Sequence, residues 1–184
     1  MTIAPTLPNL IDGPGTNNKT LIEPHVTFVH LWFGYSLMVY IGKGYVTDGA
    51  TVPQNIGECP KCYEYIKTQY PKISTRYDME SLIDILVGSP WDMPRLLGAI
   101  VHDALYDYQW MCRWVCDRIY KLVLLQFDYP VMRANVEHFC IRLCGNRNWE
   151  GVTDLDRDRT RQLVEVKIIK TKEIDSKIVE LKKR

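Results

Sequence analysis

The sequence predicts an α+β fold: a small antiparallel β-sheet followed by a three-helix core, with extended N- and C-terminal arms. Between residues 25 and 48, short runs of β-branched and aromatic residues are interrupted by glycines, which is typical of strands joined by tight turns. From residue 94 onward, apolar residues recur at helical spacing. We therefore expect an N-terminal arm over 1–24, one globular domain over 25–150 and a C-terminal arm over 151–184.

The N-terminal half is predicted to be irregular at both of its ends. Prolines and glycines among polar residues indicate an irregular segment over residues 1–20. The pattern from His25 to Asp48, with Gly34, Gly42 and Gly44 at the breaks, predicts two or three antiparallel strands. Residues 49–90 show little regular periodicity, so we expect a loop region with one short helix at 79–86.

Three consecutive helices are predicted after this loop region. Apolar positions place the first over residues 94–110, the second over about 112–127 and the third over about 130–144, ending at Gly145. Further on, the stretch VEVKIIK alternates like an exposed strand. The final residues place a thin apolar strip among charges, at Ile174, Ile178 and Leu181, which suits docking against another surface.

Composition limits the class of protein. With 23 Lys and Arg against 22 Asp and Glu, the formal net charge is +1, so we expect no nucleic-acid partner. A hydrophobic fraction of 46% argues against a disordered chain. Charges interrupt every apolar stretch before the roughly 20 residues that a membrane span needs, so no stable membrane insertion is expected. The first residues lack the features of a secretory signal, which indicates synthesis in a cytoplasm.

Two closely spaced cysteines form part of a zinc-binding motif. Cys59 and Cys62 form the half-site of a zinc knuckle, in which two thiolates on a tight turn approach one tetrahedral ion. The other half should be a second turn-borne pair, and the remaining cysteines are spaced four apart, as on a helix face. We therefore expect thiols rather than a zinc site, and no structural disulfides.

A candidate catalytic group lies in the first predicted helix. His102 and Tyr106 are four residues apart and share a helix face, with Asp103 about a quarter of a turn away. If the second helix runs antiparallel to the first, Asp117 faces His102. A carboxylate that holds one imidazole nitrogen leaves the other free to take a proton from water. The alternative is a hydrogen-bonded histidine with a structural role only.

Asp48 is the candidate for a further member of this site. It stands in the sequence Asp48-Gly49-Ala50, where small residues allow a close backbone turn. Its carboxylate either caps the following segment or joins Asp103 at a metal ion. The sequence alone leaves both roles open.

Three segments together resemble a family of small bacteriophage and prophage proteins catalogued only as a domain of unknown function. They are GYVTDGATVP over residues 44–53, HDALY over 102–106 and CDRIY over 116–120. The resemblance covers about residues 40–150. The chain departs from the family pattern, without loss of an ionisable group, at Thr51, Cys116 and Tyr120 and in the insert between Gln54 and Pro90.

His-Asp-x-x-Tyr followed by an Asp on the next helix is also similar to the core of calcium-dependent phospholipase A2 enzymes. This resemblance implies that His102 is the general base, Asp103 a calcium ligand, and Asp117 with Tyr106 the groups that orient the imidazole. Calcium needs several more oxygen ligands. The glycine-rich stretch at residues 40–44 matches the phospholipase loop pattern, but it lies far upstream of His102, and a hairpin turn explains it equally well.

Two functional classes follow from these resemblances. One is an accessory structural protein of a bacteriophage virion, in the head, neck or tail, whose arms bind neighbouring virion proteins or further copies of the chain. The other is a metal-assisted hydrolase of phospholipase A2 type, acting on lipid or cell-envelope substrates. In both cases we expect synthesis in the host cytoplasm, followed in the first case by incorporation into the virion, and the two functions are compatible.

Overall fold

The computed structural model of the chain describes residues 8–12, 18–47, 64, 68 and 93–181. The strands are β1 (Leu10–Asp12), β2 (Lys19–Leu21), β3 (His25–His30), β4 (Tyr35–Ile41), β5 (Val46–Thr47) and β6 (Val164–Lys170). The helices are α3 (Met93–Tyr108), α4 (Arg113–Gln126), α5 (Val131–Cys144), α6 (Asn146–Gly151), α7 (Asp154–Leu163), the 3-10 turn η2 (Thr171–Glu173) and α8 (Ile174–Leu181). The predicted α+β class with antiparallel strands is confirmed.

The larger sheet has the order β3-β4-β6, and both pairings are antiparallel. Strand β4 is central, with Val39 opposite Thr27 on β3 and Val166 on β6. The predicted VEVKIIK strand is confirmed as β6, an edge strand. Val164 and Val166 pack in the main core on one face of the sheet, and Ile169 packs on the other face, with α8. Because β6 is supplied by the predicted C-terminal arm, that segment is part of the main sheet.

A second sheet, of order β1-β2-β5, contains the N-terminal residues. Strand β1 pairs antiparallel with β2, and β2 pairs antiparallel with β5. Residues 10–12 and 19–21 therefore form strands within a stretch that was predicted to be irregular. The sequence signal was weak because each strand is only three residues long and its pairing partners are remote or lie across a proline- and glycine-rich segment.

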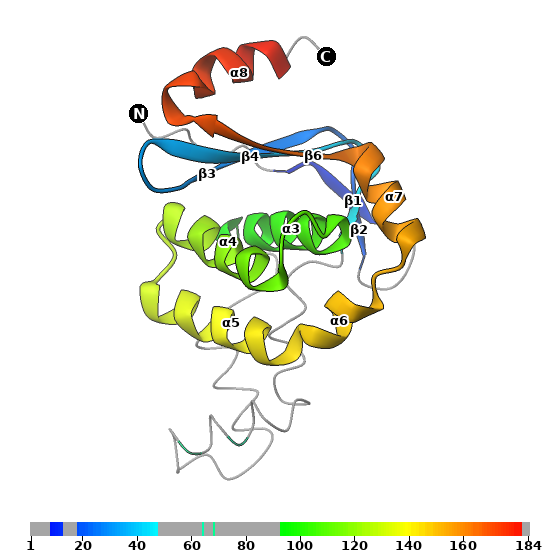
Figure 1. The fold of residues 1–184 in the computed structure, drawn as a ribbon, viewed down its shortest axis with the longest axis vertical. Helices are drawn as coiled ribbons and strands as arrows, with labels where there is room; N and C mark the ends of the chain where they lie inside the picture. Colours follow the sequence, from blue (N-terminus) through cyan, green and yellow to red (C-terminus); the bar gives the residue numbers. More distant parts are fainter. Residues whose placement is uncertain (1–7, 13–17, 48–63, 65–67, 69–92, 182–184) are drawn as a thin grey trace.

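The elements stack in layers (Figure 1). Helix α8 covers one face of the larger sheet, α3 and α4 cover the other face, and α5 packs beneath α3 and α4. The apolar strip of α8 lies against Phe28 and Met38 of the sheet. The predicted docking strip is thus covered by the chain itself, which removes its apolar side chains from water.

The main core lies between the larger sheet and α3. Val29, Leu37 and Val39 of the sheet pack with Ile100 and Leu105 of the helix, and all five are at most 1% exposed. The three predicted central helices are confirmed as α3, α4 and α5, and their bounds agree within two residues. Since α3 is buried on nearly every side, its polar residues must find partners inside the protein.

Within the described residues, no helix is long and apolar enough to cross a membrane. Cys112, Cys116 and Cys140 are free thiols. The predicted short helix at 79–86 and the cysteine pair at 59–62 lie outside the described residues.

Candidate functional site

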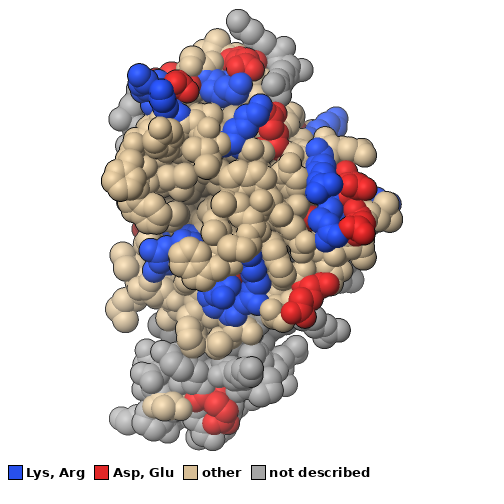
Figure 2. Space-filling view, in the orientation of Figure 1, with Lys and Arg blue, Asp and Glu red and all other residues tan. Residues whose placement is uncertain are grey.

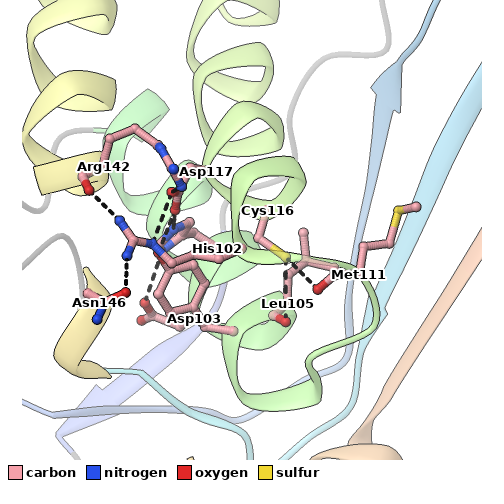
Figure 3. Close-up of polar contacts among 10 residues, drawn as sticks. His102, Asp103, Leu105, Met111, Cys116, Asp117, Arg142 and Asn146 are labelled. Atoms are coloured by element: carbon pink, nitrogen blue, oxygen red, sulfur yellow. Dashed lines mark hydrogen bonds and ion pairs between the residues drawn. The ribbon is translucent and has the colours of Figure 1, made fainter. Parts of the chain in front are cut away.

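Helices α3 and α4 bring His102 and Asp117 together. The link between the helices is short and includes Gln109 in a left-handed conformation, with φ of 48°. The helices turn back on each other, so that His102 Nε2 lies 3.0 Å from Asp117 Oδ1. Both side chains are nearly or fully buried (Figure 3). The facing arrangement that the sequence suggested is present in the structure.

Asp117 is the centre of the cluster. Its Oδ1 also accepts a hydrogen bond of 2.5 Å from the Tyr106 hydroxyl, and its Oδ2 accepts one of 2.6 Å from Arg142 Nη1. Burial alone raises the pKa of Asp117, but hydrogen bonds from His102, Tyr106 and Arg142 outweigh it and hold the pKa below the ordinary value. Asp117 is therefore a carboxylate at neutral pH.

Two arginines complete the surroundings of Asp117, and the sequence reading missed both. Arg142 reaches Asp117 from α5, while Arg113 Nε lies 3.5 Å from Asp117 Oδ2 one turn earlier on α4. The Arg113 guanidinium also donates to Asn146 Oδ1 at 2.7 Å and to the Arg142 carbonyl. The spacing of Arg113 and Asp117 was readable as a helical ion pair, whereas Arg142 is 25 residues away and carried no local signal.

His102 stands between two carboxylates. Its Nδ1 is 3.9 Å from Asp103 Oδ1, on the side opposite Asp117 (Figure 3). Burial lowers the pKa of His102, but the hydrogen bonding and negative charge of Asp103 and Asp117 outweigh this effect and raise the pKa above its ordinary value. The imidazolium form is therefore favoured by the site, and the neutral base becomes populated as the pH rises past this raised pKa.

Tyr45 and Thr47, the two neighbours of Val46, form hydrogen bonds with carboxylates of α3. Thr47 Oγ1 donates to Asp103 Oδ2 at 2.6 Å, and the Tyr45 hydroxyl donates to Asp107 Oδ2 at 2.8 Å. Burial, opposed in part by the Tyr45 hydrogen bond, raises the pKa of Asp107 to about 6. The Asp103 side chain is 24% exposed, so this edge of the cluster contacts solvent.

Gly145 makes room for the tyrosine of the site. Its φ of −70° is available to any residue, so backbone conformation does not require glycine here. A Cβ at this position would lie 2.7 Å from the Tyr106 hydroxyl oxygen, however, which is a clash. Glycine therefore ends α5 where predicted, but its structural importance is the close approach of Tyr106, which also packs edge-on against Trp149.

A second buried ionic cluster lies next to the first. Arg95 Nε donates to Glu137 at 3.2 Å, and Tyr129 donates to Glu137 Oε1 at 2.5 Å. Tyr120 also donates to Glu137, and its ring meets the His102 ring edge-on at a centroid distance of 5.5 Å. No sequence signal identified this cluster, because its members come from α3, from α4, from α5 and from the loop that joins α4 to α5.

The predicted calcium ligands are Asp103 and Asp48. Asp103 is described and partly exposed, whereas Asp48 lies outside the described residues. In the part of the chain that the structure describes, no group of three His, Cys, Asp or Glu side chains is placed to hold a metal ion.

The glycines proposed as a calcium loop lie in the turn between β4 and Tyr45. Gly44 has φ of 90°, a left-handed conformation that favours glycine. The Gly42 amide donates to the Leu163 carbonyl at 2.6 Å, which extends the antiparallel pairing of β4 with β6 beyond Ile41 and Val164. The turn thus leads the chain into Tyr45 and Thr47, which bind the α3 carboxylates.

The cluster combines three features of an acid–base site: an oriented imidazole, an ionised carboxylate behind it and a partly exposed edge. The hydrogen bonds that Asp117 accepts from His102 and Arg142 also hold α3, α4 and α5 together. Comparison of the chain with protein-family models, with curated proteins and with solved structures found no match. A functional assignment therefore depends on the geometry and electrostatics of the site.

Proposed function

We propose that this chain carries a hydrolytic site in which His102 is the general base, and that its substrates are esters of the phospholipid class. The observation that carries the proposal is the different environment of the two imidazole nitrogens. Nε2 is 3.0 Å from the ionised Asp117, whereas Nδ1 is directed toward Asp103 at the partly exposed edge, 3.9 Å away. The substrate class comes from the resemblance of the His-Asp-x-x-Tyr core to phospholipase A2.

In the proposed reaction the roles of the side chains follow from their contacts. The Nε2 hydrogen donates to Asp117, which leaves Nδ1 as the basic nitrogen. Nδ1 takes a proton from water as the water oxygen attacks the ester carbonyl carbon. The resulting imidazolium, stabilised by Asp103 and Asp117, then returns the proton to the departing alcohol oxygen as the carbon–oxygen bond breaks. Tyr106 holds Asp117 in place.

The test is release of fatty acid from a soluble short-chain phospholipid, measured with the purified full-length protein. We expect His102→Gln to lower kcat at least about 100-fold, the usual contribution of a general base. His30→Gln, an exposed histidine on β3, is the matched control and should retain the wild-type rate. Wild-type activity equal to that of His102→Gln, with both proteins folded, would reject the hydrolytic proposal.

The pH profile provides a second readout. Because only neutral His102 can accept a proton, and Asp103 and Asp117 raise its pKa, the rate should rise with pH through a value above 6.5. Asp103→Asn removes one of the two charges that stabilise the imidazolium, so the pKa of His102, followed by NMR in the calcium-free protein, should move to lower pH. A wild-type rate profile that does not follow the pKa of His102 would show that a different group controls the rate.

The same assay tests the proposed calcium requirement. The phospholipase resemblance implies that Asp103 binds calcium, and the local sequence makes Asp48 the candidate for a second ligand. We expect chelation of calcium to abolish activity in the wild type, and added calcium to restore it there but not in Asp103→Asn. Full activity in the presence of chelator would remove calcium from the proposal while leaving the role of His102 intact.

A second candidate function is that of an accessory structural protein of a bacteriophage virion. Two observations favour it. His102 is only 6% exposed, as is usual for a histidine with a structural role, and the β3–β4 turn exposes aromatic side chains. Trp32 is 63% exposed and Phe33 is 97% exposed, and such residues commonly serve as contacts with other proteins.

Incorporation into particles tests this candidate directly. If it is correct, the chain should co-sediment with purified particles, and the double variant Trp32→Ser/Phe33→Ser should be depleted from them while remaining folded. His102→Gln should still be incorporated. A wild-type chain that is absent from particles would exclude the structural role.

A further inference from the structure

Helices α4 and α5 present charge of one sign to solvent. Their two acidic residues, Asp117 and Glu137, are fully buried and bound by arginines. Their remaining charged side chains, all basic and partly exposed, are Arg113, Arg118, Lys121, Arg133 and Arg142. Figure 2 shows Lys and Arg side chains over the region of α4 and α5.

Four groups of this surface form a cluster. Arg118 and Lys121 are three residues apart on α4, and His138 and Arg142 are four residues apart on the adjoining α5, so that each pair shares a helix face. Burial and the charge of Arg118 lower the pKa of Lys121. The two helices thus hold like charges close together, and no carboxylate among the described residues forms an ion pair with Lys121.

His138 feels the same positive field. Burial and the charges of Lys121, Arg118 and Arg142 lower its pKa, and Asp117 opposes them only in part. An anion placed here would relieve this repulsion.

Two of the groups also have hydrogen-bonding capacity to spare. The His138 Nε2 atom is buried and has no hydrogen-bond partner among the described residues. Arg142 donates Nη1 to Asp117, yet its side chain remains 35% exposed. A buried polar atom without a partner is unusual in proteins and indicates a missing ligand or water.

We propose that Arg118, Lys121, His138 and Arg142 form a binding site for a phosphate-class anion. Guanidinium and ammonium groups are the side chains that recognise phosphate oxygens, and a protonated histidine adds a further charged donor. A patch of four such groups on a chain of net charge +1 suits a single phosphate better than a polynucleotide, which needs many phosphate contacts. The ligand is either a free phosphate or the phosphodiester of a lipid headgroup.

This proposal goes beyond hydrolysis and does not depend on it. The site adjoins the His102 cluster through Arg142, which contacts Asp117 directly. Binding is nevertheless measured without turnover, so His102→Gln should bind the anion as well as the wild type does. Loss of hydrolysis and loss of anion binding can therefore be observed separately.

The test is an NMR titration of the His138 ring in the full-length protein, with inorganic phosphate against chloride at equal ionic strength. We expect phosphate, but not chloride, to raise the pKa of His138. The double variant Arg118→Gln/Lys121→Gln should weaken phosphate binding about tenfold or more, because two charged contacts are removed. Arg159→Gln on α7 removes an exposed charge elsewhere and is the matched control.

A soluble short-chain phosphatidylglycerol, below its micelle concentration, distinguishes the sources. Tighter binding of this lipid than of inorganic phosphate assigns the site to a headgroup, and equal or weaker binding assigns it to a free phosphate. A His138 pKa that is the same in phosphate and chloride overturns the proposal. So does wild-type affinity in the double variant, once its amide spectrum shows that it is folded.

Discussion

The two buried carboxylates, Asp117 and Glu137, have closely similar partners and different surroundings. Each is fully buried, accepts hydrogen bonds from tyrosine hydroxyls and is paired with arginine. The partners of Asp117 are His102, Tyr106, Arg113 and Arg142, and those of Glu137 are Arg95, Tyr120 and Tyr129. The Asp117 cluster differs in containing a histidine and in reaching the surface.

Solvent access separates the two clusters. The Arg95 and Glu137 side chains are 0% and 1% exposed, whereas Asp103 and Arg142 at the edge of the other cluster are 24% and 35% exposed. Burial and Glu137 raise the pKa values of Tyr120 and Tyr129, so these hydroxyls stay protonated at neutral pH. Of the two clusters, only the one with His102 combines an imidazole, which can take up and release a proton, with a partly exposed edge, and acid–base chemistry requires both.

The largest expected effect on stability comes from the Glu137 cluster, whose Arg95 and Glu137 side chains are closed to solvent. Glu137→Ala leaves the Arg95 charge buried without its carboxylate, so the free energy of unfolding should fall by about 3–5 kcal/mol. Urea denaturation followed by circular dichroism measures this change. Glu137→Gln keeps an acceptor for the tyrosines and should lose less. A change below about 1 kcal/mol in Glu137→Ala would mean that solvent reaches Arg95.

Asp117→Asn should have a smaller effect on stability, because the partly exposed Arg142 can turn to solvent. We expect a loss of about 2–3 kcal/mol, from a buried pair that is only partly dismantled. His102 has a raised pKa, so its ion pair with Asp117 contributes fully below its ordinary pKa of 6.5 and is lost as pH rises through the raised value. The deficit of the variant should therefore shrink at alkaline pH.

Urea denaturation at pH 6 and pH 9 compares the two conditions. Asp117→Asn should also lower the pKa of His102, which NMR measures directly. A deficit that is independent of pH, together with an unshifted His102, would show that the two side chains do not interact as an ion pair.

Asp107→Asn should stabilise the protein at neutral pH. The folded-state pKa of Asp107 is raised to about 6 from 3.8, so its contribution is lost as pH rises through this interval. Asparagine still accepts the Tyr45 hydrogen bond and carries no buried charge. We expect a gain of roughly 2 kcal/mol at pH 8, the order of magnitude of a two-unit shift, and none below about pH 4. Thermal unfolding across this range tests the sign.

Thr47→Val should have the smallest effect. It removes one hydrogen bond to the partly exposed Asp103, which water can replace, so the expected loss of stability is about 1 kcal/mol or less. The more informative readout is the pKa of His102, since a less constrained Asp103 changes the charge facing Nδ1. An NMR titration of His102 identical to that of the wild type would show that Thr47 does not position Asp103.

Local patterns in the sequence predicted much of the fold. The apolar periodicity of α3, α4 and α5 and the alternation of β6 are visible over one or two turns or pleats, because each element must bury one of its own faces. The i, i+4 spacing of His102 and Tyr106 and the position of Asp117 on the next helix were likewise readable. Short strands such as β1 lacked enough residues to show a pattern.

Helical spacing in the sequence specifies which side chains each helix presents: an imidazole, a tyrosine and a carboxylate on α3, and Asp117 on α4. The partners of these side chains come from tertiary packing, since Arg142 and the Glu137 cluster depend on how α5 packs, and helix propensity carries no information about that packing. It also decided the protonation states, because the pKa of His102 results from burial opposed by two charges that are brought to it from different sides. Local periodicity specifies the apolar and polar faces of each helix and strand, whereas the packing of the whole chain specifies which of these faces contact each other.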